Sequence, residues 1–494
     1  MASYKDIAKS TSIVASIQIV QMVFGLIRNK AIALLIGTAG FGVWSIFTTF
    51  FEMIGSFSMI GLDQSAVREI ASKSDDTREI SIIIESLKSV MAITTAITVL
   101  VSIIFSKQIS CYLFDTEKYQ MGIVIVSLML IFKVISRVFY VILNGLRLLK
   151  HLAYSQILST VLGSGVTIAV IYVWRISAVA VAIGVVSIFM TIIPWFYVRK
   201  LNLQRKRITI NQAFIRSKGM LSLGLGFTVA GIVSTITTFM GKSYLSNNFN
   251  MADVGLYQAS WTVSNLYIGM ILSAMGVDFM PRLSKVANDN RAVNDLINSQ
   301  ILFGIVAGSI GVLGILLFSV PLLYLIYSSE FLRASEIVRW HVLGVFLRII
   351  AFPFSYAIMA KGKPVAYATI QIIFWVVEYL LLVFMGNLLG FDGLGVNYVL
   401  SYILYLSMSC GVTVYATKFR PTSQILKILS IIIFAIAIAF LWSSWGITDN
   451  KIYYSVSVCM IVIWGIFVHF LLKRTMQINL FSILKLRRKK HDIH

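Results

Sequence analysis

Six ionisable side chains lie deep within long apolar stretches of the sequence, where charges are rare. They are Arg28, Glu52, Lys133, Arg137, Arg348 and Glu378. Inside a membrane such a group costs about 2.5–3.5 kcal/mol on insertion scales, so it tends to face a polar cavity. Because the basic groups outnumber the acids, the predicted cavity binds an anion. A guanidinium group matches a pair of phosphate oxygens, so a diphosphate is the ligand that we expect for the four basic groups.

The two acids have two candidate roles in such a cavity. Glu52 and Glu378 either balance its charge or bind a coupling cation, and the sequence does not decide between Na⁺ and H⁺. No other cofactor and no metal site is expected, because the histidines and the cysteines are scattered along the chain. The sequence also has no catalytic cluster of His, Asp and Glu, so we expect a protein that is not an enzyme.

Uncharged polar side chains accompany these charges at helical spacing. Tyr140 follows Arg137 by three positions, on the same face of a helix. Gln371, Trp375 and Glu378 share a face in the same way. A ring offers an apolar face and an amide offers hydrogen bonds, so Tyr140, Gln371 and Trp375 are candidate sugar contacts.

The composition requires a membrane around the elements that carry these residues. The chain has 494 residues, 58% of them apolar and 13% charged, and its mean hydropathy is +0.87. Soluble domains are about 45–50% apolar and about 25% charged. A water-soluble enzyme is therefore excluded.

The net charge of +22 would suggest nucleic acid in a soluble protein. In a membrane protein it has a simpler explanation, because Lys and Arg gather in cytoplasmic loops. No zinc-finger spacing or basic stripe with aromatic residues is present, so no nucleic-acid partner is expected. Cys111, Cys410 and Cys459 are far apart and indicate no disulfide framework.

Fourteen apolar segments are long enough to cross a bilayer, which needs about 20 residues each. Their approximate limits are 10–36, 42–64, 82–106, 119–144, 152–174, 177–198, 219–244, 255–280, 299–327, 337–360, 364–386, 393–417, 428–446 and 452–472. The predicted fold is an all-α integral membrane protein with about 14 transmembrane helices. Pro321 and Pro353 lie within segments and are expected to kink them, whereas Pro364 suits a first turn.

The basic residues also predict the orientation of the chain. With the N-terminus inside, the inner loops hold 30 Lys and Arg and the outer loops hold 5. We therefore expect a multi-pass membrane protein with both termini in the cytoplasm. Lys30 and Lys242 lie near outer ends of segments, where a lysine is expected to extend its ammonium group toward water.

The sequence repeats itself at an offset of about 213 residues. Gly42–Trp44 matches Gly255–Tyr257, and Lys150–Tyr154 matches Lys363–Tyr367. Six segments separate the two copies, so both have the same orientation in the membrane, as in transporters built from parallel repeats.

This repeat predicts how the chain is divided. We expect a six-helix lobe at 1–204, a second one at 205–420, an additional helix pair at 421–478 and a basic cytoplasmic tail at 479–494. Two similar bundles around a central space favour transport.

Several motifs resemble a known family. They are Gly25–Gly42, with the sequence GLIRNKAIALLIGTAGFG, then Gly61-Leu62, Val67–Ala71 and Asp253–Tyr257. They are similar to the Wzx-type polysaccharide flippases of the multidrug/oligosaccharidyl-lipid/polysaccharide exporter superfamily. The resemblance extends over the whole chain in the number and spacing of segments.

The resemblance implies a substrate and a mechanism. The substrate is an undecaprenyl-diphosphate-linked oligosaccharide repeat unit, which moves from the cytoplasmic to the outer leaflet by alternating access, for O-antigen or a related surface polysaccharide. The implied partners are the phospholipid membrane and the polysaccharide polymerase and chain-length machinery, and the protein is expected to be a monomer. Arg28 matches the first-segment arginine of the related lipid II flippases, which meets the diphosphate.

The chain also departs from its relatives. Val43 and Trp44 stand where the lipid II flippases have an acid, and Met240–Lys242 occupies a region where many polysaccharide flippases have an Asp. These differences disfavour a lipid II role and leave the coupling ion open.

Three other functions remain alternatives. A cation-coupled multidrug exporter of the same superfamily needs an acid in the first or seventh segment, and neither has one. A membrane-embedded sugar polymerase needs a large outer loop, but the outer loops are short. A scaffold without transport would not need charged stripes.

Overall fold

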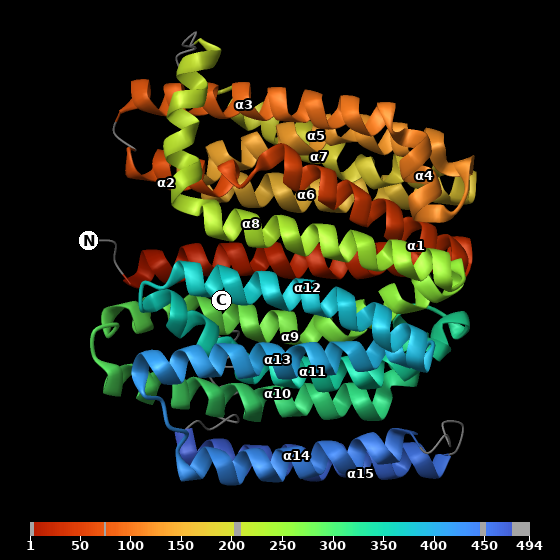
Figure 1. Ribbon diagram of the computed structural model, residues 1–494, viewed down its shortest axis with the longest axis vertical. Coiled ribbons are helices and arrows are strands. Elements are labelled where there is room, and N and C mark those ends of the chain that lie inside the picture. Colours follow the sequence, from red (N-terminus) through yellow and green to blue (C-terminus); the bar gives the residue numbers. More distant parts are fainter. Residues whose placement is uncertain (1–3, 74–75, 202–208, 445–450, 477–494) are drawn as a thin grey trace, which may run out of the picture. The chain divides into compact units, whose positions relative to one another are not determined.

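The computed structural model describes residues 4–73, 76–201, 209–444 and 451–476 (Figure 1). Within these ranges the regular elements are helices joined by short turns. The first half contains α1 (Tyr4–Met59), α2 (Leu62–Ser72), α3 (Thr77–Ile104), α4 (Ser106–Phe114), α5 (Gln120–Gly145), α6 (Leu149–Trp174) and α7 (Val179–Val198).

The second half of the described residues contains a further eight helices. They are α8 (Ile210–Asn248), α9 (Met251–Lys285), α10 (Asn290–Ile326), α11 (Ser335–Ala360), α12 (Pro364–Leu389), α13 (Gly393–Thr417), α14 (Ser423–Ser444) and α15 (Lys451–Met476). Short 3₁₀ turns precede α5, α7 and α11. The predicted all-α class is confirmed.

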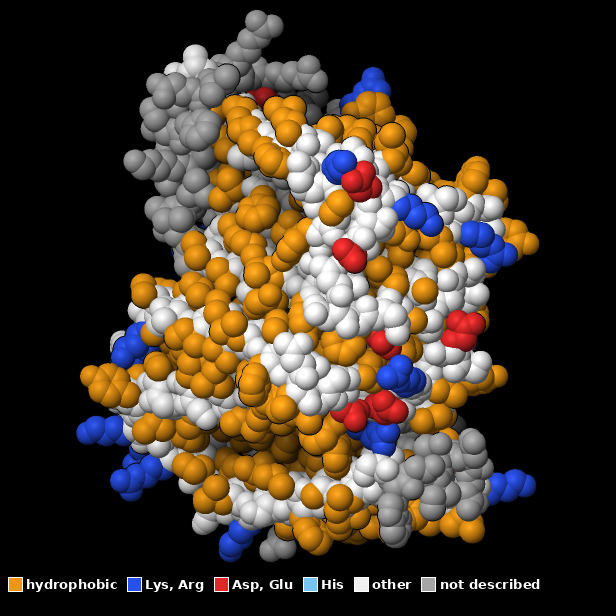
Figure 2. Space-filling model, turned by 45° about the vertical axis from the view of Figure 1, so that its right-hand side comes forward, with side chains coloured by type: hydrophobic (Ala, Val, Ile, Leu, Met, Phe, Trp, Pro, Cys, Tyr) orange, Lys and Arg blue, Asp and Glu red, His pale blue; other side chains and the backbone are white. Residues whose placement is uncertain are grey.

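Ten stretches of the described residues are long and apolar enough to cross a membrane. One of them, Ser16–Met59, has 44 residues. At about 1.5 Å per residue it is roughly 66 Å long, about twice the hydrocarbon thickness of a bilayer. The number of fourteen crossings therefore stays a prediction, although helices cover the predicted segments. Apolar side chains cover much of the face in Figure 2, and Leu34, Ile104 and Phe434 are more than half exposed, as expected for a surface in lipid.

Backbone breaks explain where several helices bend or end. α1 contains a kink at Gly37, where φ is 67° and ψ is −173°. α10 leaves helical angles at Phe318, one turn before Pro321, which confirms the kink expected there. α11 instead continues as one helix through Pro353. Pro364 occupies the first turn of α12, as predicted.

A short amphipathic helix follows α1 and was not predicted. The second segment was expected to continue to residue 64, but Gly61 has a left-handed backbone with φ of 68° and begins α2. Leu62, Ala66 and Ile70 recur every four residues and are buried, whereas Arg68 is exposed. α2 therefore packs through one apolar face.

The contacts within the chain define two compact units. Unit 1 comprises Met1–Gln258, Ile326–Phe331 and Gln371–Tyr379, and unit 2 comprises Ala259–Leu325, Leu332–Ile370 and Leu380–His494. The described segments 209–258, 326–331 and 371–379 of the predicted second lobe thus belong to unit 1. The predicted lobes at 1–204 and 205–420 stay a prediction from the repeat.

The last helix, α15, packs on α10 inside unit 2. Tyr453 of α15 donates a hydrogen bond of 3.1 Å to the carbonyl oxygen of Leu317. The indole of Trp464 donates one of 2.9 Å to the hydroxyl group of Ser309. These bonds place polar side chains of α15 against the polar groups of α10.

Candidate functional site

Arg28 has a buried hydrogen-bond donor that the described residues do not use. The side chain extends from α1, and its Nε is buried without a hydrogen-bond partner among these residues. The guanidinium carbon lies 5.8 Å from the centre of the Trp44 ring. A ring face attracts a cation but accepts no strong hydrogen bond. Arg28 can therefore still donate hydrogen bonds to an anionic ligand.

Lys133 and Glu52 form an ion pair between α5 and α1. The Lys133 Nζ lies 2.9 Å from Oε1 of Glu52 and 3.2 Å from the carbonyl oxygen of Phe51. It also lies 4.4 Å from the centre of the Phe51 ring. The Lys133 side chain is 16% exposed, whereas that of Glu52 is 62% exposed. Of the two roles considered for Glu52, this contact supports charge balance.

Arg137 is held by a carboxylate that the sequence did not assign to it. Its Nε donates to Oδ2 of Asp63 over 2.6 Å, and a second guanidinium nitrogen lies 2.5 Å from the same oxygen. Asp63 lies in the first turn of α2, where the helix dipole stabilises an anion. The guanidinium also lies 4.4 Å from the centre of the Tyr140 ring, and the Tyr140 hydroxyl accepts a hydrogen bond from Asn144.

Arg348 lies in unit 2 among neutral polar groups. Its Nη1 donates to Oδ1 of Asn265 on α9 over 2.9 Å. Three tyrosines of α13 line its surroundings, namely Tyr398, Tyr402 and Tyr405. Its described partners thus include no carboxylate, and its positive charge is not balanced by them.

The predicted residues of α12 belong to unit 1. Glu378 is buried and lies close enough to Tyr257 for an electrostatic interaction. Trp375 packs edge-on against Phe374, with ring centres 5.1 Å apart, and Gln371 is half-buried. The contacts join Lys133 to Glu52 and Arg137 to Tyr140.

Lys242 differs from the prediction, because it does not extend toward water. It is 8% exposed. Its Nζ donates to the hydroxyl group of Ser45 over 2.7 Å, to Oε1 of Gln258 over 2.8 Å and to the carbonyl oxygen of Ser45 over 3.3 Å. These acceptors surround the ammonium group. The position of Lys242 near the end of a segment did not reveal that Ser45 and Gln258 pack against it.

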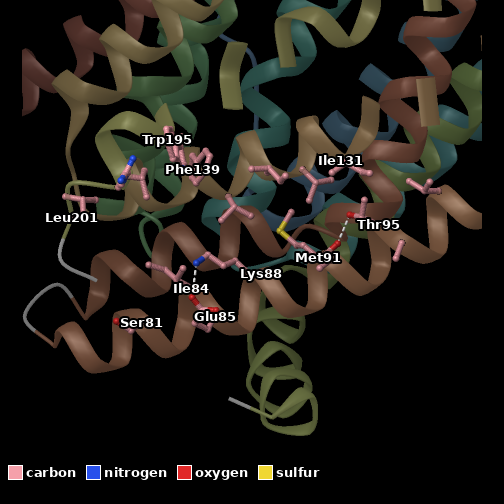
Figure 3. A pocket seen from close by; sticks show the side chains of 18 of the residues that line it. Ser81, Ile84, Glu85, Lys88, Met91, Thr95, Ile131, Phe139, Trp195 and Leu201 are labelled. Atoms are coloured by element: carbon pink, nitrogen blue, oxygen red, sulfur yellow. Dashed lines mark hydrogen bonds and ion pairs between the residues drawn. The ribbon is translucent and has the colours of Figure 1, made fainter. Parts of the chain in front are cut away.

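An apolar groove runs along unit 1 between α3, α5 and α7 (Figure 3). Its volume is about 1010 Å³. Met91, Ile131 and Phe139 are among its apolar lining residues. Lys88, which pairs with Glu85 over 2.8 Å, and Arg199 lie at the end that we predict to be cytoplasmic. The groove suits the hydrocarbon chain of a lipid. It was not predicted, because three helices that are separate in the sequence form it.

A comparison with protein families decides to which family this chain belongs. The family model described as polysaccharide biosynthesis protein matches residues 7–287, more than half of the chain. The chain belongs to this family. The predicted resemblance to the polysaccharide flippase superfamily is thereby confirmed.

Two relatives of the chain are named as a flippase and as a putative transporter. The chain is 22% identical over 421 residues to the lipid III flippase of Escherichia coli (strain K12), covering 82% of this chain and 98% of that one. It is 24% identical over 376 residues to a putative O-antigen transporter of Shigella flexneri, covering 75% of this chain and 88% of that one.

Solved structures share the fold of this family member. The lipid II flippase MurJ in an inward closed conformation matches with a TM-score of 0.73 and 16% identity, covering 94% of this chain and all of that one. An inward-facing multidrug resistance MATE family transporter of the MOP superfamily matches with a TM-score of 0.62 and 16% identity, covering 81% and 94%. At this identity the matches show the fold alone.

Proposed function

We propose that the protein is a flippase. It moves undecaprenyl-diphosphate-linked oligosaccharide repeat units from the cytoplasmic to the outer leaflet of the bacterial inner membrane, for O-antigen or a related surface polysaccharide. The observation that carries the proposal is the presence of Arg28 and Arg348 in apolar helices with no carboxylate among their described partners. Membership in the polysaccharide biosynthesis family supports it.

The four basic residues take different parts in holding the diphosphate. Arg28 has an unused donor at Nε and binds phosphate oxygens directly. Arg348 gives up one neutral acceptor, Asn265, for a charged one, and charge-assisted hydrogen bonds are about twice as strong as neutral ones. Lys133 and Arg137 must give up a carboxylate partner to bind a phosphate. They therefore contribute little net free energy to binding of the headgroup.

The proposal includes the setting of the protein and its energy source. Both termini are cytoplasmic, the protein acts as a monomer, and the exported units pass to a polymerase and its chain-length machinery. Na⁺ or H⁺ drives turnover through Glu378, which is buried on α12. Glu378→Gln then changes the Na⁺ or pH dependence of export, and an unchanged dependence would leave it a structural residue.

Multidrug exporters have the same fold, so the fold does not distinguish an exporter from a flippase. The charge of the cargo that the deep arginines attract does distinguish them. A cationic drug is repelled by Arg28 and Arg348, whereas an anionic headgroup is attracted. The exporter proposal is therefore the weaker one for this chain.

The decisive experiment is deletion of the gene in its native host. Lipid-linked oligosaccharides are then quantified separately on the two sides of the inner membrane. A flippase defect leaves repeat units on the cytoplasmic leaflet, and the wild-type gene restores export. Units that reach the outer leaflet without being joined would instead indicate a polymerase, and an unchanged distribution would overturn both functions.

A further inference from the structure

Two glycines from the two sequence repeats lie at a close backbone contact between α1 and α9. Gly42 and Gly255 are 213 residues apart, which is the offset of the repeat. A Cβ atom on Gly42 would overlap the carbonyl oxygen of Met251, and one on Gly255 would overlap that of Thr38. Only glycine allows the two backbones to approach so closely. Both residues belong to unit 1.

One helical turn further along, a second pair of counterparts is in contact. Ser45 and Gln258 are also 213 residues apart, and the Ser45 hydroxyl donates to Oε1 of Gln258 over 3.0 Å. Residues that occupy equivalent places in two repeats and touch each other lie at the axis that relates the repeats. We call this contact of α1 with α9, which lies inside unit 1, the seam.

The seam lies toward the outer side in the predicted orientation, because Gly42 begins the second apolar segment there. Phe41, next to it, packs against Tyr327 and Phe331, with ring centres 5.4 Å and 5.7 Å away. Each of the three side chains is at most 1% exposed. The outer side of the seam is thus closed by aromatic packing as well as by the glycine contact.

Lys242 of α8 joins the seam with its ammonium group. Its three hydrogen bonds to Ser45 and Gln258 match the three donors that an ammonium group has. All three acceptors are neutral. A buried charge is ordinarily paired with an opposite one, so this arrangement costs free energy relative to an ion pair. The ammonium group therefore remains available to a stronger acceptor.

We propose that Lys242, Ser45 and Gln258 form a latch that keeps the outer seam closed, and that the anionic headgroup releases it by drawing Lys242 to itself. This inference rests on the proposed function for the identity of the cargo. Phosphate oxygens are charged acceptors, and hydrogen bonds to charged acceptors are about twice as strong as those to neutral ones. Cargo thereby lowers the free energy of opening outward.

The test measures how often the seam opens, using cysteine labelling from outside. In the full chain with its three cysteines replaced by serine, the reporters are Val43→Cys and, separately, Leu256→Cys. These positions are again 213 apart and are 3% and 4% exposed. Spheroplasts of a host that makes no lipid-linked oligosaccharide are treated with a membrane-impermeant maleimide. Lys242→Met should raise the labelling rate about tenfold, because losing even one charged hydrogen bond has an effect of about that size.

A matched control removes another outer lysine. Lys107 on α4 is exposed and pairs with Glu117 over 2.8 Å, without a contact to the seam. Lys107→Met deletes the same charge and should leave labelling at the parent rate. Gln258→Leu keeps the lysine and its bonds to Ser45, so it should raise the labelling rate by less than Lys242→Met does. It serves as the test if Lys242→Met does not reach the membrane.

The second arm repeats the measurement in the host that makes the cargo. Labelling of the parent should rise, and that of Lys242→Met should not rise further. If Lys242→Met and Gln258→Leu both reach normal membrane levels and are labelled at the parent rate, the latch is overturned. This conclusion does not depend on the result of the export assay. A raised rate in the first arm together with normal export after gene deletion would keep the latch and reject the proposed function.

Discussion

At the scale of single residues, the deep cations fall into two chemical classes by their partners. Lys133 and Arg137 are paired with Glu52 and Asp63, so their charges are balanced without a ligand. Arg28 and Arg348 have no carboxylate among their described partners. An anionic ligand therefore gains most from the second class, and substitutions in the two classes should have different effects.

The first prediction concerns the cations without a carboxylate. Arg28→Gln and Arg348→Gln should each abolish export at normal membrane levels, because glutamine supplies no charge for the diphosphate. Lysine at the same positions should restore part of the activity if charge matters more than the paired geometry of a guanidinium group. Export is measured as surface polysaccharide and as lipid-linked units on each leaflet.

The control is Arg68→Gln, which removes an exposed arginine of α2 and should leave export unchanged. Normal export by both glutamine variants would contradict a headgroup role for these two residues.

The second prediction concerns the pair of Arg137 with Asp63. Arg137→Gln and Asp63→Asn should each lower the melting temperature, since each leaves a charged or polar group without its partner. The double variant should lose less unfolding free energy than the two single variants together. The difference should be an interaction free energy of about 0.5–3 kcal/mol, the range found for residues in contact. Thermal unfolding of the purified variants measures it. Additive losses would show that the pair does not stabilise the fold.

Part of this site could be predicted from the sequence, and part could not. Spacing placed Lys133, Arg137 and Tyr140 on one face of α5, because helical periodicity is a local property. Asp63 was not assigned to Arg137, since its position depends on α2, a helix too short to give an apolar signal. Lys242 was wrongly expected to reach water, because its burial depends on α1 and α9, which are distant in sequence.

At the scale of the helices, apolar length was the reliable signal. The predicted segments fall on helices because about 20 apolar residues can only be accommodated in lipid as a helix. α2 and α4 were missed because they have 11 and 9 residues and are not apolar enough to stand out. The kink expected near Pro321 is confirmed, because α10 leaves helical angles at Phe318. α11 continues as one helix through Pro353, so the kink expected there stays a prediction.

The third prediction tests the kink in α1. Gly37 combines φ of 67° with ψ of −173°, a conformation that only glycine adopts easily. Its absent Cβ would also lie 3.1 Å from Oε2 of Glu330. Gly37→Ala should therefore destabilise the protein by about 1–3 kcal/mol. The melting temperature and the membrane abundance of the variant are measured, and both should fall.

Gly25 in the same helix is the matched control. A Cβ there would meet nothing within 4 Å, and alanine favours a helix more than glycine does. Gly25→Ala should leave the melting temperature unchanged or raise it. Equal melting temperatures for the two variants would show that the kink carries no strain for alanine.

At the scale of the whole molecule, the fourth prediction concerns topology. Cys111 on α4 is exposed and lies on the outer side in the predicted orientation. With Cys410 and Cys459 replaced by serine, an impermeant maleimide should label it in intact spheroplasts. A cysteine introduced at position 210 should react only after the membrane is permeabilised. Labelling of position 210 from outside would reverse the predicted orientation.

The contact between equivalent residues also has a consequence for ancestry. A contact of Ser45 with its own counterpart is what a symmetric dimer of identical halves contains, because such an interface pairs each residue with its equivalent across the axis. Before fusion, every substitution at that position would have appeared twice. After fusion the halves can differ, and the offset pairs Lys242 with Asn29. Two ammonium groups near one axis would repel each other, so a single lysine there is a feature that only a fused chain can have.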